Sequence, residues 1–275
     1  MTPVTLEAPE QPAELVHCVV ADAVAIITLD SPHNRNALSR QLVTELFAHL
    51  RATAEDDAVT VVVLRSSGRV FCSGADLSEA SEGGMEEGAR ALVEMQRLIV
   101  AHPKPVVAAL HGPVRAGGIG IIAASDVVIA AEEATFALTE VKLGLAPAVI
   151  SLTVLPRMTS RAAALTCLTG EQFSAAEAVS MGLVTRAVPA AEVDEAVARV
   201  VASLATGAPQ GLRETKALLA RDLLAHIDDR GDDMARLSAR LFASDEAREA
   251  MGAFLGRGKP AGSGELRRST GEAGA

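Results

Sequence analysis

Two short glycine-containing segments could present backbone amides to a ligand: residues 71–77 (FCSGADL) and residues 111–120 (HGPVRAGGIG). Each follows an apolar run that is typical of a strand, at 60–64 and at 106–110. Glycine and other small residues let the backbone approach a bound group closely. Two amides that converge on a carbonyl oxygen stabilise the negative charge that develops there during a reaction. The two segments therefore indicate chemistry at the carbonyl of an acyl thioester.

Composition and charge exclude several classes of function. The net charge of −10, from 25 basic and 35 acidic residues, argues against non-specific nucleic-acid binding. The three cysteines are widely separated, which makes a zinc site improbable and fits a reducing cytoplasm. The longest apolar stretch, near 119–131, is interrupted by Ser125 and Asp126 and is too short to span a membrane. We expect a cytoplasmic protein with no metal, no nucleic-acid partner and no membrane partner.

The elements that would position the two segments alternate between strands and helices. This alternation predicts an α/β fold with parallel strands. Beyond residue 190 the pattern becomes helical, with helices expected at about 190–205, 209–227, 232–244 and 245–255. The expected organisation is a disordered lead (1–13), an α/β core (14–195), a helical region (196–260) and a disordered tail (261–275).

The second segment also allows a different interpretation. Gly118, Gly120 and Ala123 follow a strand with the spacing of a dinucleotide-binding fingerprint, and Glu140 lies about where the ribose-binding acid would stand. Such a match is weak by itself. It also leaves residues 71–77 without a role.

Taken in order, several stretches resemble the enoyl-CoA hydratase/isomerase (crotonase) superfamily. Residues 139–151, together with 117–120, resemble in particular its bacterial methylglutaconyl-CoA hydratase-like branch. The resemblance runs from about residue 19 to residue 260. The stretches that carry it are 32–39, 70–77, 104–112, 116–118, 125–126, 136–147, 168–170 and 178–184. It implies a spiral of repeated ββα units with a C-terminal helical region for trimerisation, and a homotrimer or a dimer of trimers. It also implies an acyl-CoA thioester substrate that carries its own coenzyme A, with no further cofactor.

Individual residues take their expected roles from this resemblance. The N–H groups of Ser73 and Gly117 match the oxyanion donors, and Glu140 matches the second of two catalytic glutamates. The first glutamate would fall on Gly120, so one carboxylate is missing. For His111 we expect a structural role.

A second set of residues matches positions that bind coenzyme A. Arg35 and Ala37 lie on a loop that typically contacts it. Ala75, Asp76 and Leu77 match the adenine and pantetheine side, and Lys259 matches a lysine that can reach the nucleotide phosphates.

One glutamate permits several reactions. Glu140 alone could relay protons for hydration of a 2-enoyl-CoA, or move a proton between C2 and C4 in a double-bond isomerisation. A CoA-thioester decarboxylase or hydrolase and a non-catalytic acyl-CoA binder are further alternatives. The resemblance favours hydration of a short or branched 2-enoyl-CoA, with isomerisation second.

Overall fold

A computed structural model describes residues 13–79 and 84–257 of the protein. The expected disordered tail and Lys259 lie outside these residues, as does almost all of the expected lead. Among the described helices, none is long and apolar enough to cross a membrane.

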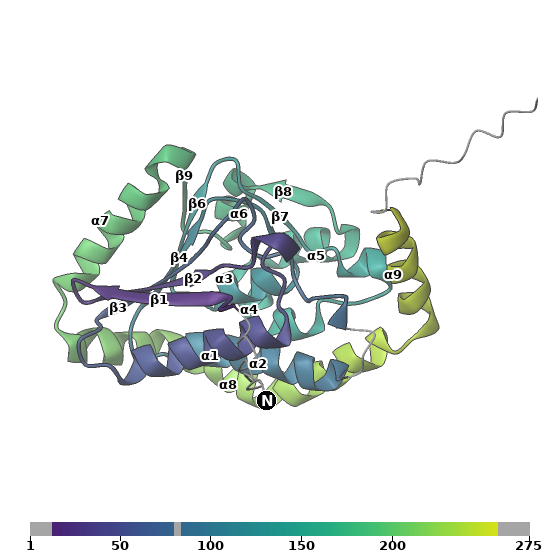
Figure 1. The fold of residues 1–275 in the computed structure, drawn as a ribbon, viewed down its shortest axis with the longest axis horizontal. Coiled ribbons are helices and arrows are strands. Elements are labelled where there is room, and N and C mark those ends of the chain that lie inside the picture. The colour runs from purple at the N-terminus through teal and green to yellow at the C-terminus, as the bar shows by residue number, and fades with distance from the viewer. Residues whose placement is uncertain (1–12, 80–83, 258–275) are drawn as a thin grey trace, which may run out of the picture.

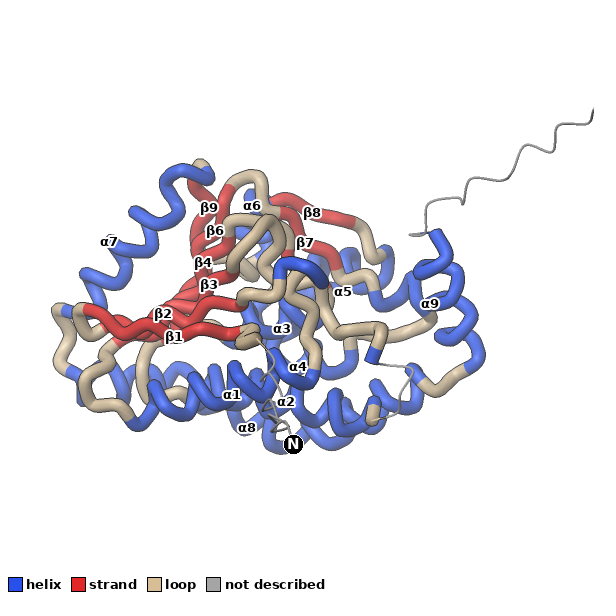
Figure 2. The backbone as a smooth tube through the Cα atoms, viewed as in Figure 1, coloured by secondary structure: helices blue, strands red, loops and turns tan. Residues whose placement is uncertain are grey.

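The larger of two sheets carries the strand order β1-β2-β3-β4-β6-β9 (Figures 1 and 2). Its strands are β1 (Val16–Ala21), β2 (Val24–Leu29), β3 (Val61–Ser66), β4 (Val106–Leu110), β6 (Val127–Ala131) and β9 (Arg186–Val188). The β1–β2 pair is antiparallel and every later pair is parallel. Strand β4 is buried at all of its positions, as parallel strands covered on both faces are. The predicted α/β class is thus confirmed.

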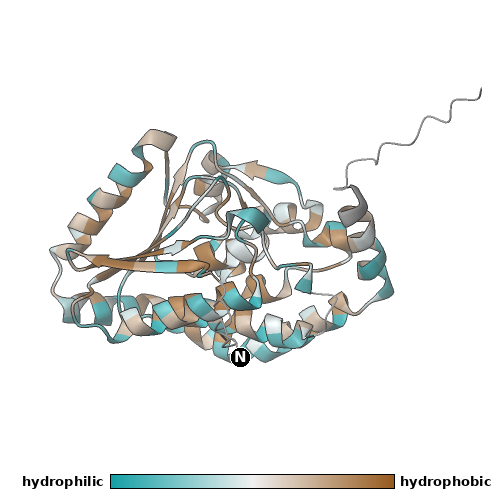
Figure 3. Cartoon of the chain, viewed as in Figure 1, coloured by the Kyte–Doolittle hydropathy of each residue, from teal (hydrophilic) through white to brown (hydrophobic). Residues whose placement is uncertain are grey.

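Helices cover both sides of this sheet. The helices α1 (Arg40–Glu55), α2 (Met85–Ala101) and α8 (Pro209–Phe242) run together along one side, and α7 (Val193–Ala205) lies on the other (Figure 1). In Figure 3 the strands of the larger sheet are mostly hydrophobic, whereas the helices alternate between hydrophobic and hydrophilic positions along their length. This alternation is the pattern of helices that bury one face against a core.

A smaller sheet lies beside the first and leads into the second glycine segment. It consists of β5 (Val114–Arg115), β7 (Thr135–Ala137) and β8 (Gln172–Ser174). The helix α3 (Gly117–Ala124) begins directly after β5. The remaining elements are η1 (Pro32–Asn34), η3 (Glu140–Leu143), α4 (Ala148–Arg157), α5 (Ser160–Thr169), α6 (Ala175–Met181), η4 (Ala190–Glu192) and α9 (Asp245–Arg257).

The helix α8 corrects one prediction. The sequence predicts two helices separated near Gly231, but a single helix of 34 residues spans Pro209–Phe242. A Cβ at Gly231 would lie 2.7 Å from Cγ1 of Val93 on α2. Gly231 therefore allows close packing of α8 against α2 and does not end a helix. The predicted domain boundary at 195 falls inside α7, and the division into domains stays a prediction.

The buried ammonium group of Lys216, paired with a carboxylate at the surface, fixes the first half of α8 to the core. Nζ of Lys216 lies 2.7 Å from the Asp126 carboxylate and donates hydrogen bonds to the carbonyls of Ile99 and Lys104. Breaking such a pair leaves a buried charge uncompensated, which is strongly destabilising. The anchored α8 brings its last residues, Ser238 and Phe242, to the cavity described below.

Candidate active site

The two glycine segments lie side by side. Cys72 forms a parallel bridge with Val114, and the Arg115 amide donates to the Cys72 carbonyl over 2.9 Å. Gly74 has a φ of 98°, and a Cβ at this position would lie 2.8 Å from the Cβ of Ala116. Only glycine can therefore adopt this backbone conformation and also allow this approach.

Two amides at this junction have no acceptor. Gly117 is the first residue of α3, so its N–H lies in the helical turn that lacks intrahelical partners. Within residues 13–79 and 84–257, neither the Gly117 N–H nor the Ala75 N–H has a hydrogen-bond acceptor. The Ser73 N–H, in contrast, donates to the Arg35 carbonyl over 3.1 Å. This bond removes Ser73 as the free donor expected from the sequence and points to Ala75, two residues further on.

Arg115 holds the backbone just before Gly117. Its guanidinium donates to the carbonyl and the hydroxyl of Thr135 over 2.6 and 2.9 Å, and to Oε1 of Gln172 over 2.9 Å. The next residue, Ala116, has a φ of 45°, which is unfavourable for a residue with a side chain. The three hydrogen bonds tie this strained turn to β7 and β8. Sequence reasoning did not identify Arg115, although an arginine two residues before a glycine pair is visible in the sequence.

A cavity of about 420 Å³ lies in front of the two free amides. Ala75, Gly117 and Glu140 all line it, as do Ser73 and Ala116. Its walls come from the first halves of α1 and α2, from the segment that joins η3 to α4, and from the ends of α8 and α9. This volume is typical of a small-molecule site.

Glu140 is a buried carboxylate without a partner at one oxygen. Within the described part of the chain, its Oε2 is buried and has no hydrogen-bond partner. Burial raises the pKa of Glu140 to about 7, although a hydrogen bond from its own backbone amide acts in the opposite direction. A carboxyl with this pKa exchanges protons readily near neutral pH, as a general acid–base requires.

The residues expected to bind coenzyme A are only partly brought together. Ala75, Asp76 and Leu77 line the cavity. Arg35 is exposed and Ala37 is buried, and the cavity lining does not include either of them.

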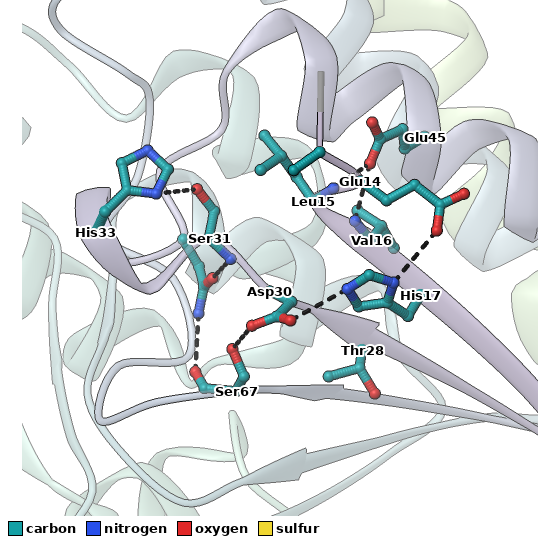
Figure 4. A network of polar contacts seen from close by, with 12 residues as sticks. Glu14, Leu15, Val16, His17, Thr28, Asp30, Ser31, His33, Glu45 and Ser67 are labelled. Atoms are coloured by element: carbon teal, nitrogen blue, oxygen red, sulfur yellow. Dashed lines mark hydrogen bonds and ion pairs between the residues drawn. The ribbon is translucent and has the colours of Figure 1, made fainter. Parts of the chain in front are cut away.

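Asn36, which sequence reasoning missed, holds the loop that contains Arg35 and Ala37. Its side-chain oxygen accepts from the Ser31 amide over 2.7 Å, and its amide nitrogen donates to the Val70 carbonyl over 2.8 Å. At the start of the loop, Asp30 accepts a hydrogen bond from Ser67 and contacts Nε2 of His17 at 3.1 Å (Figure 4). These contacts fix the loop that carries the Arg35 carbonyl, which accepts a hydrogen bond from the Ser73 N–H.

The dinucleotide interpretation is wrong. A Cβ at Gly118 would lie 2.7 Å from the Cβ of Cys72, and a Cβ at Gly120 would lie 2.7 Å from Cγ2 of Ile150. Both glycines therefore serve internal packing and do not face a ligand. Glu140 lines the same cavity as Gly117 and does not stand at a separate ribose site.

His111 lies away from this cavity. Its Nε2 is 3.3 Å from the carboxylate of Asp194 on α7, and the cavity lining does not include it. The expected structural role agrees with this placement.

Comparison with known proteins gives the family. Residues 20–264 match the family model described as enoyl-CoA hydratase/isomerase. The chain belongs to this family. The crystal structure of an enoyl-CoA hydratase from Mycobacterium avium superposes with a TM-score of 0.84 at 45% identity, covering 89% of this chain and 97% of that one.

Curated relatives include proteins named for both activities. A probable enoyl-CoA hydratase of Bacillus subtilis is 32% identical over 256 residues, which cover 91% of this chain and 99% of the relative. A peroxisomal Δ(3,5)-Δ(2,4)-dienoyl-CoA isomerase of Arabidopsis thaliana is 30% identical over 264 residues, which cover 90% of this chain and 95% of the relative. The hydratase/isomerase family thus has members named for hydration and for double-bond migration.

The buried carboxyl predicts a pH-dependent effect on stability. Because the pKa of Glu140 rises from 4.5, the ordinary value of a glutamate carboxyl, to about 7 in the fold, the folded state loses stability as the pH rises between these values. The quantity to compare is the free energy of unfolding of Glu140→Gln minus that of the wild type. We expect this difference to be about 3 kcal/mol larger at pH 8 than at pH 5. Urea unfolding at both pH values measures this difference. For Glu133→Gln, at an exposed position, the difference from the wild type should be the same at both pH values. The same result for Glu140→Gln would contradict the burial of its carboxyl.

The packing of Gly120 gives a second prediction. A methyl group there overlaps Ile150, so Gly120→Ala should lower the free energy of unfolding by about 1–3 kcal/mol. Gly120→Glu should lower it further and should not raise activity. Gly211, on α8, has nothing within 4 Å of its Cβ position, and Gly211→Ala should raise the free energy by about 0.5–1 kcal/mol. In a background that carries Ile150→Ala, Gly120→Ala should lower the free energy of unfolding by less than it does in the wild type. Equal losses in the two backgrounds, measured by urea unfolding, would refute the overlap.

Proposed function

We propose that this protein hydrates a short or branched 2-enoyl-CoA, with coenzyme A as part of the substrate and no separate cofactor. The observation that carries the proposal is the position of one proton-exchanging carboxylate, Glu140, in the same cavity as the free amides of Ala75 and Gly117. The amides suit a thioester oxygen, and the carboxylate suits the proton transfers that hydration requires.

The proposed reaction uses the three groups in two steps. The ionised Glu140 removes a proton from a water molecule, and the water oxygen forms a bond to C3 of the enoyl chain. The C2–C3 π electrons then move toward the thioester, whose oxygen becomes an enolate oxygen that accepts hydrogen bonds from the Ala75 and Gly117 amides. This charge is larger in the transition state than in the substrate, so the amides accelerate the step. The protonated Glu140 then delivers its proton to C2 and returns to its starting form.

Double-bond isomerisation is the second candidate. The absence of a carboxylate at Gly120 favours it, because one glutamate suffices to carry a proton between C2 and C4. Thioester decarboxylation, thioester hydrolysis and binding without turnover use the same cavity and are outcomes of the test below.

We further propose a cytoplasmic homotrimer or dimer of trimers. Four leucines on two helices support a subunit contact, since each exposes more than half of its surface. They are Leu165 and Leu168 on α5, and Leu218 and Leu219 on α8. Each helix thus exposes two large apolar side chains that are close together in the sequence, and contiguous exposed apolar groups are typical of interaction sites.

Product analysis tests the reaction. Incubation with crotonyl-CoA should add the mass of one water, whereas a 3-enoyl-CoA that gains no mass but changes its double bond would show an isomerase. Release of free coenzyme A would show a hydrolase. Loss of carbon dioxide from a carboxylated thioester would show a decarboxylase, and saturable binding without any product would show a carrier.

Glu140→Gln should reduce kcat by a factor of about 10² to 10⁴ while acyl-CoA binding persists, because the amide cannot accept the proton. In the wild type, kcat/KM should fall about tenfold per pH unit below an apparent pKa near 7, since hydration starts from the ionised carboxyl. Stopped-flow hydration assays between pH 5 and pH 9 measure both effects. Full activity of Glu140→Gln, or a flat profile across this range, would remove Glu140 from the mechanism.

Replacing single backbone amides distinguishes the two candidate donors. Lactic acid, the α-hydroxy analogue of alanine, can be introduced at position 75 by nonsense suppression and replaces the N–H by an ester oxygen. We expect kcat to fall by a factor of about 10² to 10³, as when one oxyanion donor is removed. The matched control is glyceric acid at position 73, which removes the Ser73 bond to Arg35. The assignment of Ala75 fails if the substitution at 73 is the more damaging of the two.

A further inference from the structure

Much of the lining of the cavity is apolar, and we refer to this part of the lining as the apolar wall. This wall comes from the segment before α4 and the first turn of α4, from α2, and from the ends of α8 and α9. Its side chains include Leu92, Leu145, Val149, Ile150, Phe242 and Phe254. Val149 belongs to a small buried cluster with Ala89 and Ala235, against which Leu92 packs. An acyl chain that enters this part of the cavity exchanges water for aliphatic and aromatic groups.

Charge on the cavity lining is mostly negative. The described lining residues include one cation, Arg40, and the carboxylates of Asp76, Glu79, Glu87 and Glu140. Arg40 is exposed at the start of α1, and its backbone amide donates to Oε2 of Glu79 over 2.9 Å. The lining therefore carries more acidic than basic side chains.

Arg40, the one cation of the described lining, lies close to Gly84. A Cβ at Gly84, where α2 begins, would lie 3.6 Å from Nη2 of Arg40 and 3.9 Å from Oε2 of Glu87. Both side chains therefore approach the backbone of Gly84, and Arg40 itself is exposed. Within the described residues, the wall offers no cation to a second anionic group on a substrate.

Resting on the hydratase function proposed above, we propose that the site accepts 2-enoyl-CoA thioesters whose acyl chain ends in a methyl group and rejects those whose chain ends in a carboxylate. A carboxylate transferred from water into an apolar wall without a partner is strongly disfavoured. A second negative charge near Glu140 would also oppose ionisation of the group that must remove the proton from water. Both effects act against the charged chain and leave an uncharged chain unaffected.

Two substrates with the same carbon skeleton test this selectivity. In 2,3-dehydroadipyl-CoA a carboxylate replaces the terminal methyl group of (E)-2-hexenoyl-CoA. We expect kcat/KM to be at least about 100-fold higher for hexenoyl-CoA, as a poorly compensated buried charge predicts. Values within threefold of each other, or a preference for the dicarboxylic substrate, would overturn the proposal.

A variant supplies the cation that the wall lacks. Phe242 lines the cavity and is only partly buried, so Phe242→Lys adds an ammonium group there without emptying the core. It should reduce the preference for hexenoyl-CoA at least tenfold. Leu241→Lys is the matched control, since Leu241 is also partly buried but does not line the cavity, and it should leave the preference unchanged. An unchanged preference in Phe242→Lys would contradict the placement of the chain end at this wall.

Binding separates this proposal from the proposed reaction. Calorimetric titration with the saturated thioesters hexanoyl-CoA and adipoyl-CoA requires no turnover. If the protein hydrates neither enoyl substrate but binds hexanoyl-CoA at least tenfold more tightly, hydration fails and the selectivity stands. If hexenoyl-CoA is hydrated but the two saturated thioesters bind equally and the two enoyl substrates react with kcat/KM values within threefold, hydration stands and the selectivity fails. Hydration of neither enoyl substrate together with binding of neither saturated thioester overturns both.

Discussion

The arrangement of this protein depends on keeping one carboxyl group, that of Glu140, out of water without a partner for its Oε2 atom. A buried charge of this kind opposes folding, and its elevated pKa expresses that cost. The same feature gives Glu140 its capacity to exchange protons near neutral pH. It can persist only because a large buried core stabilises the fold, in which the strands of the larger sheet and the mutually packed helices α2, α4 and α8 take part.

The second requirement is that the backbone amides of Ala75 and Gly117 remain without an acceptor from the protein, so that they can bind a thioester oxygen. Gly74 and Ala116 come so close that a side chain at 74 would collide, and Ala116 itself has a positive φ. Hydrogen bonds from Arg115 to the Thr135 carbonyl and from Asn36 to the Val70 carbonyl hold the two loops in place. The site therefore consists of strained or closely packed backbone that its neighbours fix, as functional sites commonly do.

The sequence allowed part of this to be predicted, and the errors have physical causes. Buried apolar runs identified β3 and β4, and the spacing of small residues identified the two loops. Residue types do not reveal which amide is already bonded, so the sequence favours Ser73, although its N–H donates to the Arg35 carbonyl and the Ala75 N–H is free. The predicted break between helices near 228–231 is wrong because the role of Gly231, close packing against Val93, involves a residue far away in the sequence. In the same way, the sequence shows that no carboxylate stands at position 120, but it does not show that the Ile150 side chain occupies the space beside Gly120.

The central claim is that Ala75, Gly117 and Glu140 act on the same thioester. A crystal structure with a bound 3-hydroxyacyl-CoA, the product of the proposed hydration, tests it most directly. We predict that the thioester oxygen accepts hydrogen bonds from the Ala75 and Gly117 amides, and that the 3-hydroxyl group lies within hydrogen-bond distance of the Glu140 carboxylate. A thioester oxygen bound elsewhere, or a 3-hydroxyl group on the face of the chain away from Glu140, would contradict the account.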